Sequence, residues 1–217
     1  MTAVIFDMDG VLLDTERVGM TAWMDAAREQ GCDLTPEVFT GLIGLDGAGT
    51  RHHLRQHGWE HEAIDRLQRV AWAKYVRALE RDGVSHKSGM FELLDFLDQK
   101  AIPRAVATST QTELAERKLQ RIGVLNRFHA IVGGDQVSRG KPAPDIYLRA
   151  AERLQCAPMT CVALEDSGPG IHAAAAAGMK VIWVPDLCKV DRATQELAFA
   201  TAQSLSDAIT LIDRLIE

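Results

Sequence analysis

Short apolar runs recur along the chain, and segments with helical spacing of apolar residues separate the later ones. Short runs bounded by polar residues are typical of strands buried on both faces of a parallel sheet. The runs occur at 3–6, 104–107, 130–133, 161–164 and 180–184. The helical segments occur at 90–99, 111–122, 144–155 and 168–177. Because strands alternate with helices, the pattern predicts an α/β fold with a doubly wound parallel sheet and right-handed crossovers.

The interval between the first two predicted strands departs from this alternation. Most of 17–82 has apolar residues at helical spacing, interrupted by glycines and by a Thr-Pro pair. So long a segment exceeds what a crossover loop needs. We therefore expect an α-helical cap domain at 15–84, inserted into a Rossmann-like core domain that is formed by 1–14 and 85–217.

Composition and charge narrow the classes of protein. The chain has 217 residues, of which 47% are hydrophobic and 25% charged, and its formal net charge is −6. That charge argues against a nucleic-acid binder, which would normally carry a basic face. It leaves room for an anionic substrate, because a bound metal and a few local cations can outweigh a modest global charge.

Cysteine spacing and hydropathy indicate the cellular compartment in which the protein is expected. The four cysteines have spacings that match no zinc pattern. Two aspartates interrupt the only apolar run near the N-terminus, and no run of about 18 apolar residues occurs elsewhere. We therefore expect a cytoplasmic protein without a membrane partner. A monomer is our default expectation.

The end of the first strand carries an acidic pair. Asp7-Met8-Asp9-Gly10 follows the run at 3–6 directly, and ligands of open parallel sheets bind beyond the carboxyl ends of strands. Phosphoryl transfer needs two such groups. One carboxylate attacks phosphorus and carries the phosphoryl group, and the other passes protons to and from the oxygens. The alternative is an acidic turn without a catalytic role.

Three later segments add groups that suit the same chemistry. Thr108 and Ser109 follow the second strand and precede a helix, where hydroxyls and free N–H groups can bind a phosphate oxygen. Lys141, in a loop stiffened by two prolines, can offset negative charge. Glu165 and Asp166 end the fourth strand and suit a hard cation, with Mg²⁺ fitting best. Taken alone, each has an ordinary explanation as a helix cap or a solvated loop residue; taken together they predict an active site.

Four motifs in this order resemble the haloacid dehalogenase superfamily of hydrolases. The resemblance covers essentially the whole chain and points to the subgroup with a helical cap, which includes β-phosphoglucomutase and sugar-phosphate phosphatases. The motifs are VIFDMDGVLLDTE at 4–16, VATST at 106–110, GKPAPDIY at 140–147 and CVALEDSGPGIHAAAAAGM at 161–179.

The resemblance implies catalytic and phosphate-binding roles. By its pattern Asp7 is the nucleophile and Asp9 the general acid and base. Thr108 and Lys141 would bind the transferring phosphoryl group. Backbone groups at Met8 and Ser109 would complete the phosphate cradle.

The resemblance also implies a magnesium ion. Asp7, the carbonyl of Asp9 and Asp166 would hold Mg²⁺, with Glu165 nearby, directly or through water. The acid at position 9 favours phosphoryl transfer over dehalogenation, because a halide leaving group needs no proton.

Phosphatase and mutase remain alternatives within this resemblance. Mutases carry a histidine, an arginine and a lysine that manage a second phosphate, and those positions align here with Gly19, Gly47 and Ala71. Arg51 or Lys74 could substitute. Without a second phosphate site, water should take the phosphoryl group. We therefore expect a phosphatase that hydrolyses a small phosphorylated metabolite, either a sugar phosphate or a nucleoside monophosphate.

Two features of the expected cap are harder to interpret. The glycine-rich loop at 44–49 could face the substrate, in which case Asp46 or Arg51 would touch the leaving group; the alternative is an ordinary turn between helices. The histidines at 52, 53, 57 and 61 include pairs spaced by four residues, but we expect a solvated helix face rather than a zinc site.

Two other classes of protein remain open. A receiver-type signalling module also combines a phosphorylatable aspartate with acids, a hydroxyl and a lysine, but it is usually about half this length and has its acidic pair on the first strand. A catalytically idle binding protein on the same fold is the other class.

Overall fold

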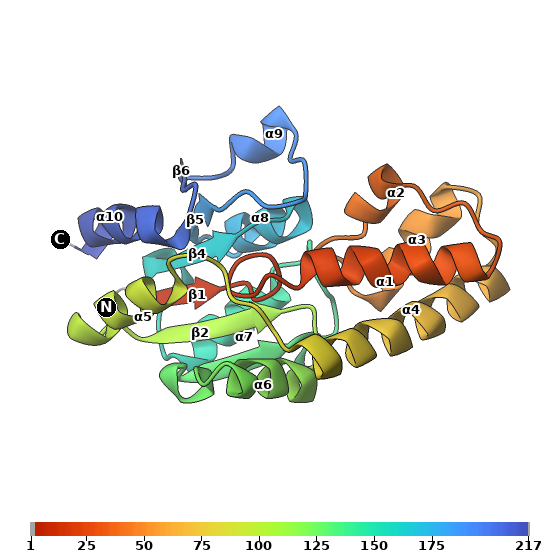
Figure 1. Cartoon of the computed structure of the whole chain (residues 1–217). Coiled ribbons are helices and arrows are strands. Elements are labelled where there is room, and N and C mark those ends of the chain that lie inside the picture. Colours follow the sequence, from red (N-terminus) through yellow and green to blue (C-terminus); the bar gives the residue numbers. More distant parts are fainter. Residues whose placement is uncertain (1–2, 217) are drawn as a thin grey trace.

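A parallel sheet forms the centre of the computed structural model, which describes residues 3–216 (Figure 1). Its six strands have the order β3-β2-β1-β4-β5-β6. They are β1 (Ala3–Phe6), β2 (Arg104–Thr108), β3 (Ala130–Gly133), β4 (Cys161–Glu165), β5 (Lys180–Trp183) and β6 (Ala200–Thr201). The doubly wound α/β fold and all five predicted strands are confirmed. The sequence pattern missed β6, because two residues are too short for an apolar run to stand out.

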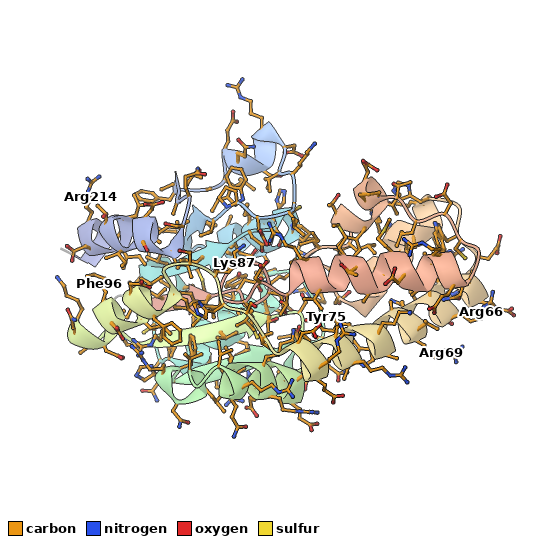
Figure 2. The ribbon with its side chains drawn as sticks, in the orientation of Figure 1. Arg66, Arg69, Tyr75, Lys87, Phe96 and Arg214 are labelled. Carbon is orange, nitrogen blue, oxygen red and sulfur yellow. The ribbon has the colours of Figure 1, made fainter. Side chains whose placement is uncertain are left out.

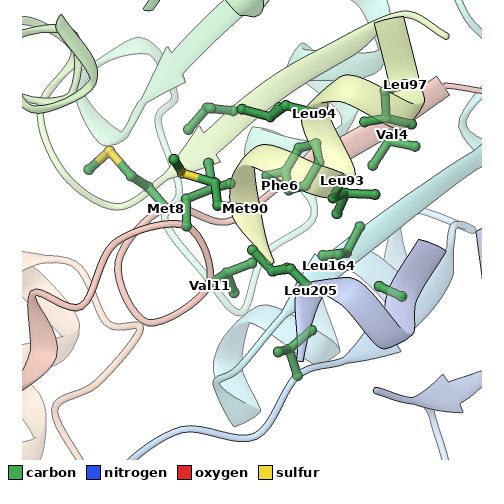
Figure 3. Packing of buried hydrophobic residues seen from close by; sticks show 14 of the residues in the cluster. Val4, Phe6, Met8, Val11, Met90, Leu93, Leu94, Leu97, Leu164 and Leu205 are labelled. Carbon is green, nitrogen blue, oxygen red and sulfur yellow. The ribbon is translucent and has the colours of Figure 1, made fainter. Parts of the chain in front are cut away.

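Helices cover both faces of the sheet, and alternate residues of β1 contact opposite faces. Val4 and Phe6 pack into one apolar cluster under α5, α6 and α10, part of which Figure 3 shows, whereas Ala3 and Ile5 pack into another under α7 and α8. The helices of this part are α5 (Met90–Gln99), α6 (Thr112–Arg121), α7 (Asp145–Arg153), α8 (Gly168–Ala176), α9 (Arg192–Gln195) and α10 (Leu205–Ile216). Three short 3-10 helices are Leu125–Arg127, Gly134–Gln136 and Pro158–Thr160.

Four helices lie together beside this sheet, and we call them the helical unit (Figure 1). They are α1 (Glu16–Glu29), α2 (Pro36–Thr40), α3 (Gly47–Gln56) and α4 (His61–Asp82). The unit has its own apolar cluster, which includes Ala26, Leu54 and Leu67. These helices fall where the sequence predicts them. The division into a cap and a core domain at those boundaries stays a prediction.

The two connections between the sheet and the helical unit run side by side. The N–H of Asp14 donates to the carbonyl of Ser85 at 2.9 Å, and the N–H of Lys87 donates to the carbonyl of Leu12 at 2.8 Å. Asp186, which follows β5, accepts from Lys87 at 2.8 Å (labelled in Figure 2) and from the Arg17 guanidinium at 3.1 Å. The loop after β5 therefore holds both connections at the carboxyl edge of the sheet. Among the described helices, none combines the length and the apolar character that a membrane crossing requires.

Candidate active site

The predicted acids and the predicted lysine meet at the carboxyl edge of the sheet. Asp7 follows β1, and its N–H donates to the carbonyl of Leu164 in β4 at 2.9 Å. Lys141 donates from Nζ to Oδ1 of Asp7 and to Oε1 of Glu165, both at 2.6 Å. All three side chains are almost completely buried. Segments more than 130 positions apart in the sequence thus form one compact charged cluster.

Lys141 is the positive centre of this cluster. Burial alone would lower the pKa of Lys141, but Asp7 and Glu165 raise it above its ordinary value, so the ammonium stays charged. Burial raises the pKa of Asp7 to about 7, and the charge of Lys141 partly offsets that rise. The charge of Lys141 therefore stabilises the ionised form of the buried Asp7 carboxyl group.

Glu165 orients the lysine. Its Oε1 also accepts from the hydroxyl of Tyr147 at 2.7 Å. Its Oε2 accepts from the N–H groups of Asp166 and Ser167 and from the Ser167 hydroxyl, at 3.0–3.1 Å. Both carboxylate oxygens of Glu165 thus accept hydrogen bonds from the protein, and one of these bonds fixes the position of the Lys141 ammonium.

Asp166 differs from its neighbour because it lacks donors. Both of its carboxylate oxygens are buried without a hydrogen-bond partner. Burial, with Glu165 and Asp7 nearby, raises its pKa well above the ordinary value. Orphaned buried carboxylate oxygens call for a ligand. Ligand atoms of Asp7, Glu165 and Asp166 all lie within 4.8 Å of one another, which fits a hard divalent cation.

Gly10 makes room for this arrangement. It has a φ of +88°, and a Cβ there would collide with Oδ2 of Asp166. Only glycine combines this left-handed backbone with so close an approach. The glycine of the DMDG motif is therefore needed so that the strand ends of β1 and β4 can face each other.

Asp9 lies in a separate set of donors. Lys118 donates from Nζ to its Oδ1 at 2.6 Å, and the hydroxyl of Thr110 donates to its Oδ2 at 2.8 Å. The hydroxyl of Thr15 also donates to Oδ1. Burial would raise the pKa of Asp9, but Lys118 and the hydroxyls lower it below its ordinary value. Asp9 is thus held as a carboxylate, apart from the Lys141 cluster.

Sequence reasoning missed Lys118, Thr110 and Thr15. Lys118 looks like one of several charged residues on a polar helix, yet it shares the buried face of α6 with Ala115 and Leu119. The signal that could have found it is that spacing, which puts a lysine on an apolar helix face.

The predicted phosphate cradle lies beside the acids. Thr108 is buried, and its hydroxyl accepts from the N–H of Thr110 at 3.1 Å. The hydroxyl of Ser109 donates to the carbonyl of Gly44 in the helical unit at 3.0 Å. The Met8 side chain packs in the apolar cluster of Figure 3, so only its backbone faces the site. Phosphate binding by these groups stays a prediction.

A cavity of about 560 Å³ lies between the acids and the helical unit. Its lining from the sheet side consists of Asp7, Asp9, Thr108, Ser109, Thr110 and Gln111. Its lining from the connection and the helical unit includes Thr15, Glu16, Gly19, Trp23, Phe39, Leu42, Ile43, Gly44, Leu45, Asp46, Gly47, Thr50, Gln68, Arg69, Trp72 and Tyr75. The cavity is therefore the place for a leaving group attached to a phosphate at Asp7.

The two tentative specificity residues have different positions. Asp46 lines the cavity and caps α3, where it accepts from the N–H of Gly49 at 2.7 Å. Arg51 is exposed on α3 and is not among the lining residues, so this arrangement does not contain the contact expected of it. Arg69 on α4 is the cation that lines the cavity instead.

The positions that align with mutase residues hold no cation. Gly19 and Gly47 line the cavity, whereas Ala71 is fully buried in the helical unit. Lys74 pairs with Glu29 at 2.7 Å and does not line the cavity. Neither suggested substitute, Arg51 or Lys74, is among the residues that line the cavity.

The cap histidines form no metal-binding group in the described part of the chain. The rings of His53 and His57 are tilted relative to each other with centroids 4.7 Å apart, and burial lowers the pKa of His53. The single group of acids, histidines and cysteines with metal-ligand spacing in residues 3–216 is the one at Asp7.

Comparisons with known proteins agree with this geometry. The family model described as haloacid dehalogenase-like hydrolase matches residues 4–184. A phosphorylated carbohydrates phosphatase of Thermotoga maritima is 34% identical over 183 residues, which is 84% of each chain. A fructose-1-phosphate phosphatase of Escherichia coli K12 is 32% identical and aligns over 82% of this chain and 94% of its own length.

Solved structures show the same fold. A β-phosphoglucomutase of Clostridium difficile superposes with a TM-score of 0.83 over 98% of this chain and 96% of its own. At 22% identity this likeness concerns the fold alone. The segment that the family model matches contains Asp7, Lys141 and Asp166, and the two relatives are named phosphatases. The chain is an enzyme that belongs to the haloacid dehalogenase-like hydrolases, and its likeness to these relatives supports a phosphatase.

Proposed function

We propose that this enzyme is a Mg²⁺-dependent phosphatase of small phosphorylated metabolites that forms an aspartyl-phosphate on Asp7. The observation that carries the proposal is the position of the Asp7 carboxylate. It directly follows β1. The charged Nζ of Lys141 lies 2.6 Å from its Oδ1, and an unpartnered carboxylate oxygen of Asp166 lies within 4.8 Å. Such a carboxylate is both held in place and balanced by charge when a phosphate dianion approaches.

The first step transfers the phosphoryl group to the enzyme. An Oδ of Asp7 attacks phosphorus, and the bond between phosphorus and the ester oxygen breaks. Asp9, which takes up a proton from solvent when the substrate binds, gives that proton to the ester oxygen. Lys141 offsets the charge of the nucleophile and of the phosphoryl oxygens. Thr108 and the backbone at Met8 and Ser109 bind those oxygens.

The second step returns the enzyme to its starting state. Asp9, now a carboxylate, takes a proton from a water molecule, whose oxygen attacks the phosphorus of the aspartyl-phosphate. The bond between phosphorus and Asp7 breaks, and inorganic phosphate leaves. The pairing of Asp9 with Lys118 favours this carboxylate form.

Asp7, Asp166 and the carbonyl of Asp9 would hold the magnesium ion, with Glu165 behind them. When bound, the ion neutralises charge on the nucleophile and on the phosphoryl group. The unpartnered oxygens of Asp166 are the observation in this chain that supports the site. Glu165 would contribute mainly by fixing Lys141, because its oxygens already accept hydrogen bonds.

The helical unit would serve as a cap that excludes water from the site. It contacts the phosphate side through Gly44 and Ser109 and lines most of the cavity. We propose the boundaries at 15–84 for this cap, and a monomer as the working form. The names of the relatives favour a sugar-phosphate type of substrate.

A mutase would need a site for a second phosphate. Among the described residues that line the cavity, the exposed Arg69 is the only cation. A buried pair of cations opposite the acids would have favoured a mutase, and the described residues provide none there. This observation supports transfer to water.

Phosphate release from a substrate panel tests the proposal. Purified protein is incubated with sugar phosphates, polyol phosphates and nucleoside monophosphates, with Mg²⁺ or with a chelator. We expect release from one chemical group of substrates that needs Mg²⁺. Isomerised sugar phosphate without net release would instead identify a mutase, and a stable phosphoprotein without turnover would identify a receiver-like protein.

A further inference from the structure

Two helices that pack against each other, α1 and α4, contribute aromatic side chains to the cavity lining. On α1 the lining residues Glu16, Gly19 and Trp23 follow a helical spacing, and on α4 Arg69, Trp72 and Tyr75 do the same. Each set therefore lies on one face of its helix. Tyr75 lies nearer the sheet than Arg69 does (Figure 2).

The aromatic rings form two walls. The rings of Trp23 and Phe39 have centroids 6.4 Å apart, and those of Trp72 and Tyr75 have centroids 5.9 Å apart. Gly19 has no side chain, and a Cβ added there would meet only Phe39, at 3.8 Å. The space above Gly19 is therefore open for a ligand, with aromatic rings among its neighbours.

The wall on α4 connects the outer cavity with the proposed acid. Nζ of Lys118, which holds Asp9, lies 5.1 Å from the ring centroid of Tyr75. Trp72, the next ring outward, is 50% exposed. An exposed tryptophan beside a cavity is typical of a ligand-binding surface. A leaving group that is released beside Asp9 would thus lie next to the rings of Tyr75 and Trp72.

The chemistry of this wall discriminates between kinds of leaving group. A sugar or polyol buries several hydroxyls, and each hydroxyl without a partner costs free energy. Trp23, Phe39, Leu42 and Ile43 offer no side-chain acceptor, so the hydroxyls of a sugar would depend on Glu16 and Asp46 in the same lining. A planar ring instead gains from stacking on aromatic faces.

Polar groups at the edge of the wall suit such a ring. Gln68 can both donate and accept, and Arg69 can donate to a carbonyl or to a ring nitrogen. The cavity volume of about 560 Å³ lies within the range of roughly 300–1,000 Å³ that holds drug-sized ligands. A nitrogen heterocycle therefore finds faces to stack on and edges to bind.

We propose that the preferred substrates are phosphate monoesters whose alcohol carries a planar nitrogen heterocycle, such as a nucleoside or a flavin. This assignment rests on the proposed phosphatase function and goes against the sugar-phosphate names of the relatives. The heterocycle stacks on Trp72 while the phosphate lies at Asp7.

Relative kcat/KM values test the assignment. The wild-type enzyme with Mg²⁺ is assayed with uridine monophosphate, adenosine monophosphate and flavin mononucleotide, and with fructose 1-phosphate and sorbitol 6-phosphate. We expect at least one heterocyclic substrate to exceed both sugar-type substrates about tenfold or more in kcat/KM. Equal or higher values for the sugar-type substrates would overturn the assignment and leave the phosphatase intact.

A tryptophan variant tests the stacking. Trp72→Ala should lower the ratio of heterocyclic to sugar-type kcat/KM by roughly 5- to 100-fold, the size of one base–aromatic stacking contact. Trp72→Phe should restore most of that ratio. Phe199→Ala is the matched control, because Phe199 is 56% exposed and does not line the cavity. An unchanged ratio in Trp72→Ala would contradict stacking on this ring, even if both rates fell together.

Binding of the dephosphorylated product separates the two proposals. Riboflavin and uridine are titrated against the wild-type protein and Trp72→Ala, with binding followed by isothermal titration calorimetry. Binding that weakens in Trp72→Ala supports the assignment even if no substrate is hydrolysed, in which case the phosphatase proposal fails alone. Tighter binding of fructose than of either heterocycle would contradict the assignment.

Discussion

Nζ of Lys118 lies 2.6 Å from Oδ1 of Asp9, and this buried pair joins the α6 helix to the end of β1. The lysine lowers the pKa of the aspartate, which favours the carboxylate that a general base needs. A carboxylate in this position cannot give a proton to a leaving group. To act as the proposed general acid, Asp9 therefore has to take up a proton and leave Lys118 when the substrate binds. We infer that Lys118 is a positioning residue for this proton-transfer group.

Replacing Lys118 tests this role. Lys118→Met should lower kcat by about 10- to 100-fold, part of the 10²- to 10⁴-fold that a general acid–base group contributes. The loss of the lysine charge should also raise the pKa of Asp9, so the limb of the pH–rate profile that belongs to Asp9 should move to higher pH. Steady-state kinetics over a pH series measure both effects.

A matched lysine variant controls for a general effect of charge. Lys100 pairs with Asp213 on the surface, at 2.8 Å, and lies on no cavity-lining element. Lys100→Met should keep the wild-type kcat and pH profile. A Lys118→Met enzyme that is folded and has both wild-type kcat and profile would contradict the role of Lys118.

Metal binding should stabilise the protein through Asp166. A ligand at about 100 times its Kd adds about 2.7 kcal/mol of folding free energy, which is several degrees of Tm for a chain of this size. Mg²⁺ should therefore raise the Tm of the wild-type protein in a thermal shift assay. Asp166→Asn should abolish that rise, because it removes the unpartnered carboxylate.

The Tm of Asp166→Asn without Mg²⁺ gives an independent readout. Without the ion, the charge of Asp166 lies near Asp7 and Glu165, so Asp166→Asn should melt higher than the wild-type protein in chelator. Asp33→Asn is the control, since Asp33 is exposed in the helical unit. A full Mg²⁺ response in Asp166→Asn would show that the ion binds elsewhere.

Glu16 should make stability depend on pH. Burial, with Asp9 and Asp7 nearby, raises the pKa of Glu16 to about 8, whereas an unfolded glutamate titrates near 4.3. Between these values the unfolded chain releases the proton and the folded protein keeps it, so stability falls as the pH rises from about 4 to 8.

Glu16→Gln should remove this part of the pH dependence. At pH 8 the variant should melt about 2–4 °C above the wild-type protein, which corresponds to about 1 kcal/mol, and at pH 4 the two should melt alike. Differential scanning calorimetry at the two pH values measures the difference. A variant that melts below the wild-type protein at pH 8 would show that the ionised side chain is stabilising.

Much of the fold could be predicted because its determinants are local. The strand at 3–6 and the acids that follow it are adjacent in sequence, and the same holds for 161–164 with Glu165 and Asp166. The rule that parallel strands end at one edge then brings these groups together without further information. Strands β1 to β5 and helices α5 to α8 were therefore predictable within a few residues, whereas β6, α9 and α10 were not predicted.

Contacts between distant helices could not be predicted in the same way. Lys118 and Asp9 are 109 positions apart, and although helical spacing places Lys118 on the apolar face of α6, nothing in the sequence identifies Asp9 as its partner. The contact expected of Arg51 stays a prediction for a related reason, because the direction of a side chain on a short helix depends on how that helix packs. The position of Arg69 facing the cavity likewise follows from the packing of α4 against α1.

Detection of a phosphoryl group on Asp7 tests the central claim most directly. The enzyme is mixed with Mg²⁺ and a ³²P-labelled substrate from the panel, quenched with acid within milliseconds to seconds, digested and analysed by mass spectrometry. We predict transient label on the peptide that contains Asp7 and release of that label by hydroxylamine. A folded Asp7→Asn variant should show neither label nor turnover. Turnover without label on the protein, or an Asp7→Asn variant that still releases phosphate, would contradict the account.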